Sequence, residues 1–182
     1  LGIDPVKKVI LFAAHILDNN SRKGADVLLE AINKFDNPEH YLLMLVGEGG
    51  QTWAEKTSVD IKLMGFVQDH RHLAEIYSAA DVVAIPSAVE NLPNVLIEAL
   101  ACGRAVIAND AGGMRDGIRH LETGYLAELG DSVDMASGLR LVLNDKTMQQ
   151  SMEAASRSFF EEQFTSEIEI LRIVTLYREI SK

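Results

Sequence analysis

The sequence predicts an α/β fold built on a doubly wound parallel sheet, and three features of the pattern support this prediction. Short apolar runs of strand length recur along the chain, as expected for strands that are buried on both faces. Segments with the apolar spacing of a helix lie between these runs, so that strand and helix alternate. Glycine, proline or short polar stretches end the runs. Because no repeat or linker-like stretch interrupts this order, we expect a single domain over residues 1–182.

Apolar runs place the expected strands at 7–14, 41–46, 61–64, 82–85, 105–108 and 124–126. Between them, apolar spacing places helices at 25–35, around 52–56, and up to Ala79. A further helix follows Pro93, a residue that suits a first helical turn, and ends at Gly103 as its C-cap. Apolar residues cover most of the circumference of this helix, so we expect it to be largely buried.

The chain from Asp131 onward is expected to be helical and to add C-terminal helices to the sheet domain. Thr147 with Gln150 and Ser166 with Glu169 have the spacing of capping boxes, which predicts two helix starts. The final helix carries an apolar stripe, formed by Ile170, Ile173, Val174 and Tyr177.

Composition and charge narrow the classes of partner. Hydrophobic residues make up 47% of the chain and charged residues 24%, which fits a soluble globular protein. No apolar run reaches the length of a membrane span and no signal peptide is visible, so we expect no membrane binding. The net charge of −10 argues against nucleic acid as a partner. The single cysteine, Cys102, favours a cytoplasmic location, and the start at Leu1 indicates a piece of a longer protein.

The notable polar residues fall in the loops that follow the expected strands. Ligands of open α/β sheets bind at the carboxyl ends of the strands, so these loops form the expected site. They are, in chain order, 22–24, 47–50, 65–67, Glu90 and 110–113.

Arg22 and Lys23 precede a helix start, where cations oppose the helix dipole. That placement makes sense if a phosphate binds there, and the alternative is that both residues are solvated cations on a surface loop. The glycines at 47–50 lack the spacing of a dinucleotide fingerprint, which disfavours a dehydrogenase and favours a turn with positive φ angles. Five scattered histidines and one cysteine offer no zinc-ligand spacing, so no metal is expected.

Glu90 and Glu98 are the most informative pair of residues. A carboxylate such as Glu98 on a mostly buried helix is costly unless a partner hydrogen-bonds it. Two acceptors flanking the positive end of a helix suit a ligand with hydroxyls at both extremities and phosphate between them, which is the shape of a nucleotide sugar. The alternative is that Glu98 pairs with a cation such as Arg104 while Glu90 is solvated.

Residues 90–103 (ENLPNVLIEALACG) resemble the E-x7-E signature of retaining GT-B glycosyltransferases of the group 1 (GT4-like) family. The flanking segments fall in family order over almost the whole chain, among them Arg22-Lys23-Gly24, Tyr77-x-x-Ala80-Asp81 and Thr123-Gly124-Tyr125-Leu126. The resemblance implies a Rossmann-like domain, one half of a GT-B fold, that binds the nucleoside-diphosphate sugar. An N-terminal acceptor-binding domain would be absent from this chain.

The resemblance also implies roles for individual residues. Glu90 would contact the transferred sugar and act in catalysis, and Glu98 would hold the ribose hydroxyls. Lys23 would hold the diphosphate with help from Arg22. The backbone near Gly65 and Val67 would contact the base. The backbone amides around Asn94 and Val95 would contact the phosphates. No cofactor is implied.

Two positions depart from the family pattern. An arginine that many members carry soon after the first strand, in G-R-L, is replaced by Ala14-His15-Ile16, so Arg22 is the candidate substitute. The common F-G after the first glutamate is Leu92-Pro93, and Pro93 has no N–H to offer a phosphate.

These observations predict the donor-binding domain of a retaining glycosyltransferase, inactive as an isolated chain because the acceptor half is missing. The alternative is a non-catalytic nucleotide-sugar or protein-binding module on the same fold. An epimerase or phosphorylase is a third candidate, for which no motif stands out.

Overall fold

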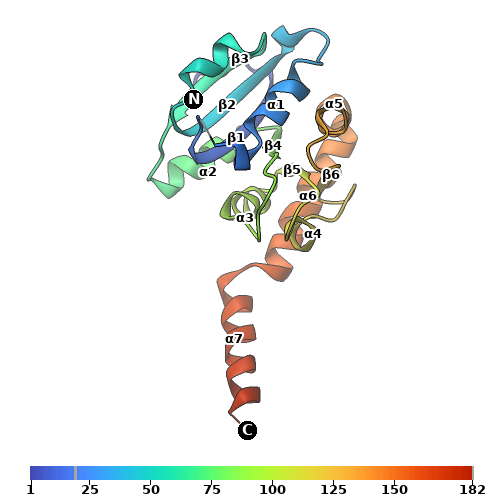
Figure 1. The fold of residues 1–182 in the computed structure, drawn as a ribbon. Coiled ribbons are helices and arrows are strands. Elements are labelled where there is room, and N and C mark those ends of the chain that lie inside the picture. Colours follow the sequence, from blue (N-terminus) through green and yellow to red (C-terminus); the bar gives the residue numbers. More distant parts are fainter. Residues whose placement is uncertain (19, 182) are drawn as a thin grey trace.

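The computed structural model describes residues 1–18 and 20–181 and contains one six-stranded parallel sheet (Figure 1). The strand order is β3-β2-β1-β4-β5-β6, and every pairing is parallel. The order reverses between β1 and β4, which makes this pair the topological switch point of a Rossmann-like sheet. The doubly wound fold predicted from the sequence is therefore confirmed.

Each expected strand forms, with ends that differ from the prediction by at most two residues. The strands are β1 (Lys8–Ile16), β2 (Tyr41–Glu48), β3 (Asp60–Gly65), β4 (Val82–Ile85), β5 (Ala105–Asn109) and β6 (Gly124–Ala127). Successive side chains of a strand point to opposite faces, and β1 accordingly supplies both cores. Ile10 and Phe12 pack on one face of the sheet, while Val9 and Leu11 pack on the other.

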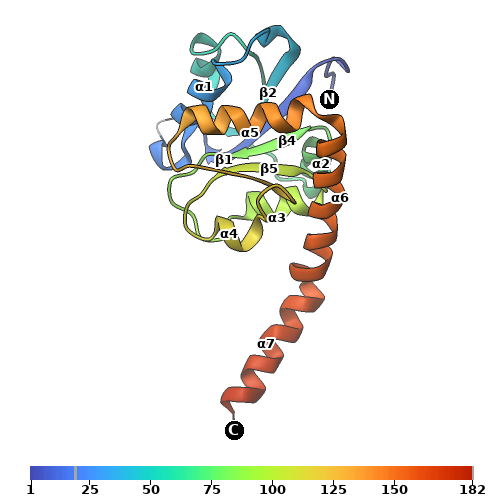
Figure 2. The same ribbon diagram turned by 90° about the vertical axis from the view of Figure 1, so that its right-hand side faces the viewer.

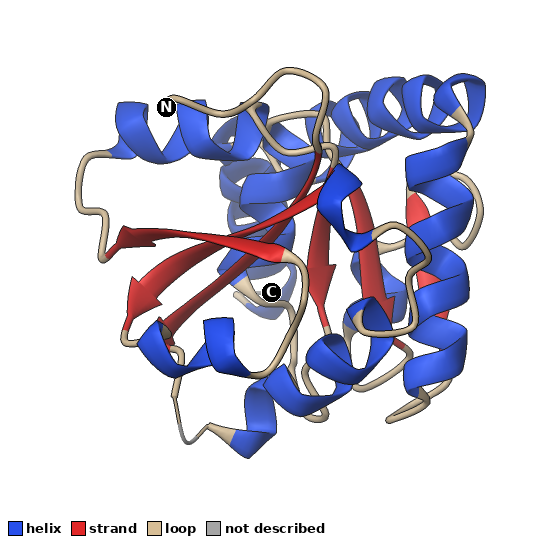
Figure 3. Ribbon diagram, turned by 90° about the horizontal axis from the view of Figure 1, so that it is seen from above, coloured by secondary structure: helices blue, strands red, loops and turns tan. Residues whose placement is uncertain are grey.

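Helices cover both faces of the sheet (Figure 3). α1 (Ala25–Ile32) and α5 (Ser132–Asn144) bury their apolar stripes in the core that contains Ile10 and Phe12. α2 (His70–Ser78) and α3 (Asn94–Ala101) bury theirs in the core that contains Val9 and Leu11. The remaining helical segments are η1 (Ser21–Lys23), η2 (Pro38–His40), η3 (Gln51–Glu55), α4 (Met114–Gly117), α6 (Lys146–Gln163) and α7 (Ser166–Ile180).

The structure corrects several predicted helix boundaries. α1 ends at Ile32, and Phe35 lies beyond it in a turn, where its ring packs 4.5 Å from that of Tyr41. The predicted helix at 52–56 is the 3-10 helix η3, which begins one residue earlier. These differences arise because side chains in a turn can be as well buried as those on a helix, so apolar spacing alone does not mark the last helical residue.

Both predicted capping boxes are wrong. Asp145 caps α6 by accepting a hydrogen bond from the Met148 amide at 2.9 Å, and Thr147 lies inside the helix. Thr165 caps α7 in the same way, one residue before the predicted Ser166. In both cases the capping residue has the extended backbone that an N-cap requires, and its side chain is the first able to reach the free amides.

α7 leaves the body of the domain, as Figures 1 and 2 show. The predicted helix is confirmed, but its apolar stripe is not buried in the described chain. Ile170, Ile173, Val174 and Tyr177 are all exposed. Over residues 1–18 and 20–181, no helix is long and apolar enough to cross a membrane.

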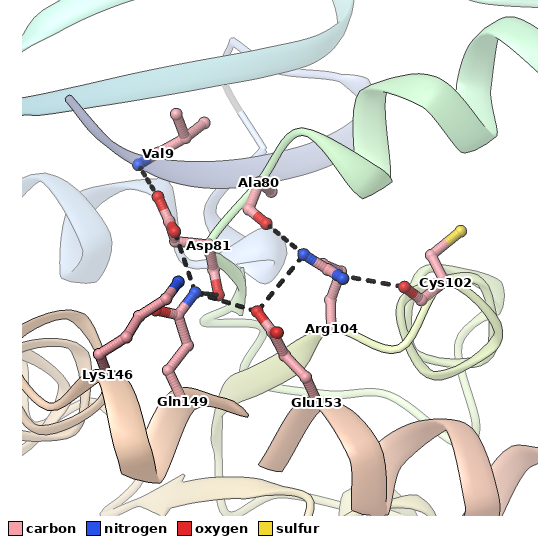
Figure 4. A network of polar contacts seen from close by, with 8 residues as sticks. All are labelled: Val9, Ala80, Asp81, Cys102, Arg104, Lys146, Gln149 and Glu153. Atoms are coloured by element: carbon pink, nitrogen blue, oxygen red, sulfur yellow. Dashed lines mark hydrogen bonds and ion pairs between the residues drawn. The ribbon is translucent and has the colours of Figure 1, made fainter. Parts of the chain in front are cut away.

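A network of polar contacts joins α6 to the edge of the sheet where β1 and β4 begin (Figure 4). The Asp81 carboxylate accepts hydrogen bonds from the Val9 amide at 2.8 Å and from the Gln149 side chain at 2.9 Å. Gln149 also donates to Glu153, which forms an ion pair with Arg104 at 3.4 Å. Since each group has a partner from another element, the network fixes α6 against the strands.

We predict that Asp81→Ala lowers the free energy of unfolding by about 2 kcal/mol, because the Val9 amide and Gln149 lose their acceptor. Denaturant unfolding followed by circular dichroism measures this change. Asp36→Ala, at an exposed turn, is the control and should change stability by less than about 0.5 kcal/mol. Equal effects of the two substitutions would contradict the structural role of the network.

Candidate functional site

The candidate site is centred on the loop 86–91, which follows β4 at the carboxyl edge of the sheet. Pro86 and Ser87 are buried, and the Pro86 carbonyl accepts a hydrogen bond from the Asn109 side chain at 2.6 Å. The loop after β1 holds it on one side, where the Ala88 amide donates to the Arg22 carbonyl at 2.9 Å. The loop after β5 holds it on the other side, where the Gly113 amide donates to the Glu90 carbonyl at 3.1 Å.

Two glycines make these close approaches possible. Gly24 has a φ of 70°, and a Cβ atom there would lie 1.8 Å from the Pro86 carbonyl oxygen. Gly112 has a φ of 55°, and a Cβ atom there would lie 1.8 Å from the Glu90 carbonyl oxygen. Only glycine fits such positions, since any side chain would both strain the backbone and collide with the loop. The glycines therefore bring the loops after β1, β4 and β5 into direct contact.

Lys23 and Glu90 meet inside this three-loop cluster. The Lys23 Nζ atom lies 2.5 Å from Glu90 Oε1, and their side chains are 21% and 14% exposed. Partial burial strengthens the attraction between the two charges relative to a fully solvated pair. The prediction that a cation precedes the start of α1 is confirmed, because Lys23 ends η1 and only Gly24 separates it from α1. Arg22 joins the cluster through its carbonyl, while the residue as a whole is exposed.

Glu98 lies on α3 and has a partner that the sequence did not predict. The hydroxyl of Tyr77, on α2, donates a hydrogen bond to Glu98 Oε2 at 2.7 Å. Burial, reinforced by the negative charge of Glu98, raises the pKa of Tyr77 far above its ordinary value, so the hydroxyl remains a donor. The pairing of Glu98 with Arg104 is wrong, because Arg104 instead contacts Glu153 and the carbonyl oxygens of neighbouring residues.

The amino end of α3 faces the same loop. Pro93 was expected in the first turn but is the N-cap, with an extended backbone (φ −73°, ψ 145°) and no side-chain hydrogen bond to the helix. Asn94 and Val95 therefore form the first turn, where backbone amides lack helical acceptors. The expectation that this helix is largely buried is partly confirmed, because Leu96, Ala99 and Leu100 are buried while the other residues of α3 are half-buried or exposed.

The segment after β3 carries the two residues expected near a base. Gly65 ends β3 with a φ of 70° in open space, and Val67 is half-buried. Between them, Phe66 is 50% exposed and stacks edge-to-face on His15, with ring centroids 5.1 Å apart. His15 stands near the place of the arginine found in many family members, so this aromatic pair is a feature that the sequence pattern did not reveal.

The prediction of a turn at 47–50 is only partly confirmed, because Gly47 lies within β2 and only Gly49 and Gly50 follow the strand. Gly47, Gly49 and Gly50 have positive φ angles. Asp18 holds the segment between β2 and η3, because its carboxylate accepts hydrogen bonds from the Gly50 amide at 2.9 Å and from the Trp53 indole at 3.1 Å. Over the described residues, 1–18 and 20–181, no group of three His, Cys, Asp or Glu side chains is placed to hold a metal ion.

Comparisons with known proteins agree with this geometry. Residues 7–145 match the family model of the group 1 glycosyl transferases. The chain is 27% identical to the N-acetyl-alpha-D-glucosaminyl L-malate synthase of Bacillus anthracis over 98% of the chain and 47% of that protein. The sucrose-phosphate synthase structure from Thermosynechococcus elongatus superposes with a TM-score of 0.83, at 28% identity over 97% of this chain and 46% of that one.

The structure of Anabaena HepE in complex with UDP and glucose has the same fold, with a TM-score of 0.80 at 22% identity over 95% of this chain and 49% of that one. The chain belongs to the group 1 glycosyl transferases. It spans about half the length of the curated relatives it matches and corresponds to their C-terminal half.

We predict that Gly24→Ala destabilises the domain by about 3 kcal/mol, because the new Cβ atom meets the Pro86 carbonyl in addition to straining the backbone. Gly130→Ala is the matched control, since Gly130 has a similar φ of 77° but open space around it. Strain alone should cost the control about 1 kcal/mol. Thermal or denaturant unfolding compares the two, and equal losses would show that the contact between the loops is not tight.

Proposed function

We propose that this chain is the donor-binding domain of a retaining glycosyltransferase, which transfers a sugar from a nucleoside diphosphate to an acceptor hydroxyl. The observation that carries the proposal is the contact between Lys23 and Glu90 beside the amino end of α3. A cation for the diphosphate and a carboxylate for the sugar thus lie next to each other. The named activities of the relatives and the UDP complex of HepE support the same class of donor.

Each part of the donor has a candidate partner in the proposed site. The diphosphate contacts Lys23 and the free amides of Asn94 and Val95, with Arg22 close by. The ribose hydroxyls donate to Glu98, which has no cation as its partner among the described residues. The remaining contacts are those of the base with the backbone at Gly65 and Val67.

The chemistry depends on stabilising the charge of the leaving group. When the bond between the sugar and the diphosphate breaks, negative charge grows on the diphosphate, and Lys23 together with the positive end of α3 offsets it. We expect no metal ion or cofactor, because these protein groups supply the positive charge. Glu90 lies where it can orient the sugar, and the second domain of the whole protein would bring the acceptor to the same point.

We predict saturable binding of at least one of UDP, GDP and ADP to the chain, weakened about 10- to 100-fold by Lys23→Ala. The substitution removes a charged hydrogen bond to phosphate and leaves Glu90 without its cation, so that two negative groups face each other. Glu98→Ala should weaken binding by about 10-fold through loss of the ribose acceptor. Isothermal titration calorimetry measures the dissociation constants.

The control for charge is Lys34→Ala, which removes an exposed lysine just beyond the other end of α1 and should leave the affinity unchanged. A wild-type chain that binds none of the three nucleotides with a Kd of about 1 mM or tighter would contradict the proposed function.

We further predict that the isolated 182-residue chain binds the donor without multiple turnover, because the acceptor-binding half of the cleft is missing. Release of nucleoside diphosphate from UDP-glucose and similar donors, measured with the chain alone and with the full-length protein, tests this expectation. Multiple turnover by the chain alone would overturn it. A full-length protein that transfers no sugar from any common donor would instead favour the non-catalytic binding module.

A further inference from the structure

We propose that Tyr77 is a positioning residue, which holds the Glu98 carboxylate in the orientation that accepts the ribose hydroxyls. The inference rests on the proposed function, since it assigns a task within the same nucleotide site. Nothing in the sequence pattern connects Tyr77 with Glu98, which lie 21 residues apart on different helices.

The packing of Tyr77 in the core holds its side chain in a position from which it can orient Glu98. Its side chain is 1% exposed and packs in the same core as Leu96, Ala99 and Leu100, the buried face of α3. Close packing of the ring in this core restricts the movement of its hydroxyl, which lies 2.7 Å from Glu98 Oε2. The glutamate has a flexible side chain and is only half-buried, so this hydrogen bond selects one of its rotamers.

The hydrogen bond from Tyr77 also gives the two carboxylate oxygens of Glu98 different roles. A carboxylate accepts about four hydrogen bonds over its two oxygens, and Tyr77 uses Oε2. In the described residues, Oε1 accepts no hydrogen bond from the protein, so it is available to neighbouring hydroxyl groups of a ribose. Because the phenol is neutral, it orients the carboxylate without offsetting the negative charge that attracts those hydroxyls, as a cation such as Arg104 would.

Tyr77 further ties the ribose contact to the segment expected to face the base. α2 begins directly after that segment, and Asp69 caps it by accepting a hydrogen bond from the Arg71 amide. α2 therefore follows the base-facing segment closely in the chain and also carries the donor that orients Glu98.

The test is Tyr77→Phe, assayed by calorimetry with whichever of UDP, GDP and ADP the wild-type chain binds best, and with the 2′,3′-dideoxy form of that nucleotide. The change keeps the ring in the core and removes only the hydroxyl. We expect a loss of about 5- to 20-fold in affinity for the ribonucleotide and of less than about 2-fold for the dideoxy form. A purely structural role would weaken both nucleotides equally.

Tyr125→Phe is the matched control. Tyr125 on β6 donates a hydrogen bond to Asp134 on α5 at 2.6 Å, and this bond raises the pKa of Tyr125 to about 12. The substitution thus removes a second tyrosine–carboxylate hydrogen bond outside the proposed nucleotide contacts, and both nucleotides should keep their wild-type affinity. If Tyr77→Phe does not fold, Glu98→Asp withdraws the carboxylate from an intact Tyr77 and should give the same selective loss.

The outcomes separate the two proposals. Unchanged ribonucleotide affinity in Tyr77→Phe, or equal losses for both nucleotides, would overturn the role of Tyr77 while leaving the proposed function in place. Full preference for the ribonucleotide in Glu98→Asp would contradict the contact between Glu98 and the ribose, and the role of Tyr77 with it. A wild-type chain that binds none of the nucleotides would overturn the proposed function, and the role of Tyr77 with it.

Discussion

The close approach of three loops at the carboxyl edge of the sheet is the constraint on which the candidate site depends. Lys23 and Glu90 are far apart in sequence, and they meet because β4 lies beside β1 in the sheet. Strand order alone would bring their loops near each other without fixing them. The glycines at 24 and 112 remove the last steric barrier, and backbone hydrogen bonds from Ala88 and Gly113 then hold the loop in place. The strand order and the absence of side chains at Gly24 and Gly112 together allow Lys23 and Glu90 to form their ion pair.

The ion pair within this cluster has a consequence for ligand binding. In a chain of net charge −10, an isolated cation that attracts phosphate must be kept in position while the site is empty. Glu90 does so, because the partly buried pair fixes the Lys23 side chain at the point where the proposed diphosphate binds. In the proposed function, a phosphate that binds Lys23 would share or displace the contact with Glu90, so that the carboxylate would become available to the sugar.

The sequence predicts the helices and strands of this fold better than it predicts where the helices begin and which side chains are in contact. Strands buried on both faces leave an unmistakable apolar run, and each of the expected strands forms. The predictions of helix caps were wrong because several polar residues near 145–150 could act as the N-cap of α6. The backbone geometry decides which of them does so. The partner of Glu98 could not be predicted, since the contact with Tyr77 depends on how α2 and α3 pack. The sequence predicted that Lys23 and Glu90 lie in loops at the same edge of the sheet, but only the structure shows that the two side chains form a pair.

The replacement of F-G by Leu92-Pro93 now has a physical interpretation. Proline at 93 fixes an extended N-cap and offers no amide, so the first amides without helical acceptors belong to Asn94 and Val95. Leu92 helps to hold this arrangement, because its side chain and that of Leu96 both lie against Gly117 in α4, where any Cβ atom would collide with them. The amino end of α3 is thereby anchored from the β5 side of the site. In the proposed site, the amides of Asn94 and Val95 are therefore the ones available to a phosphate at this end of the helix.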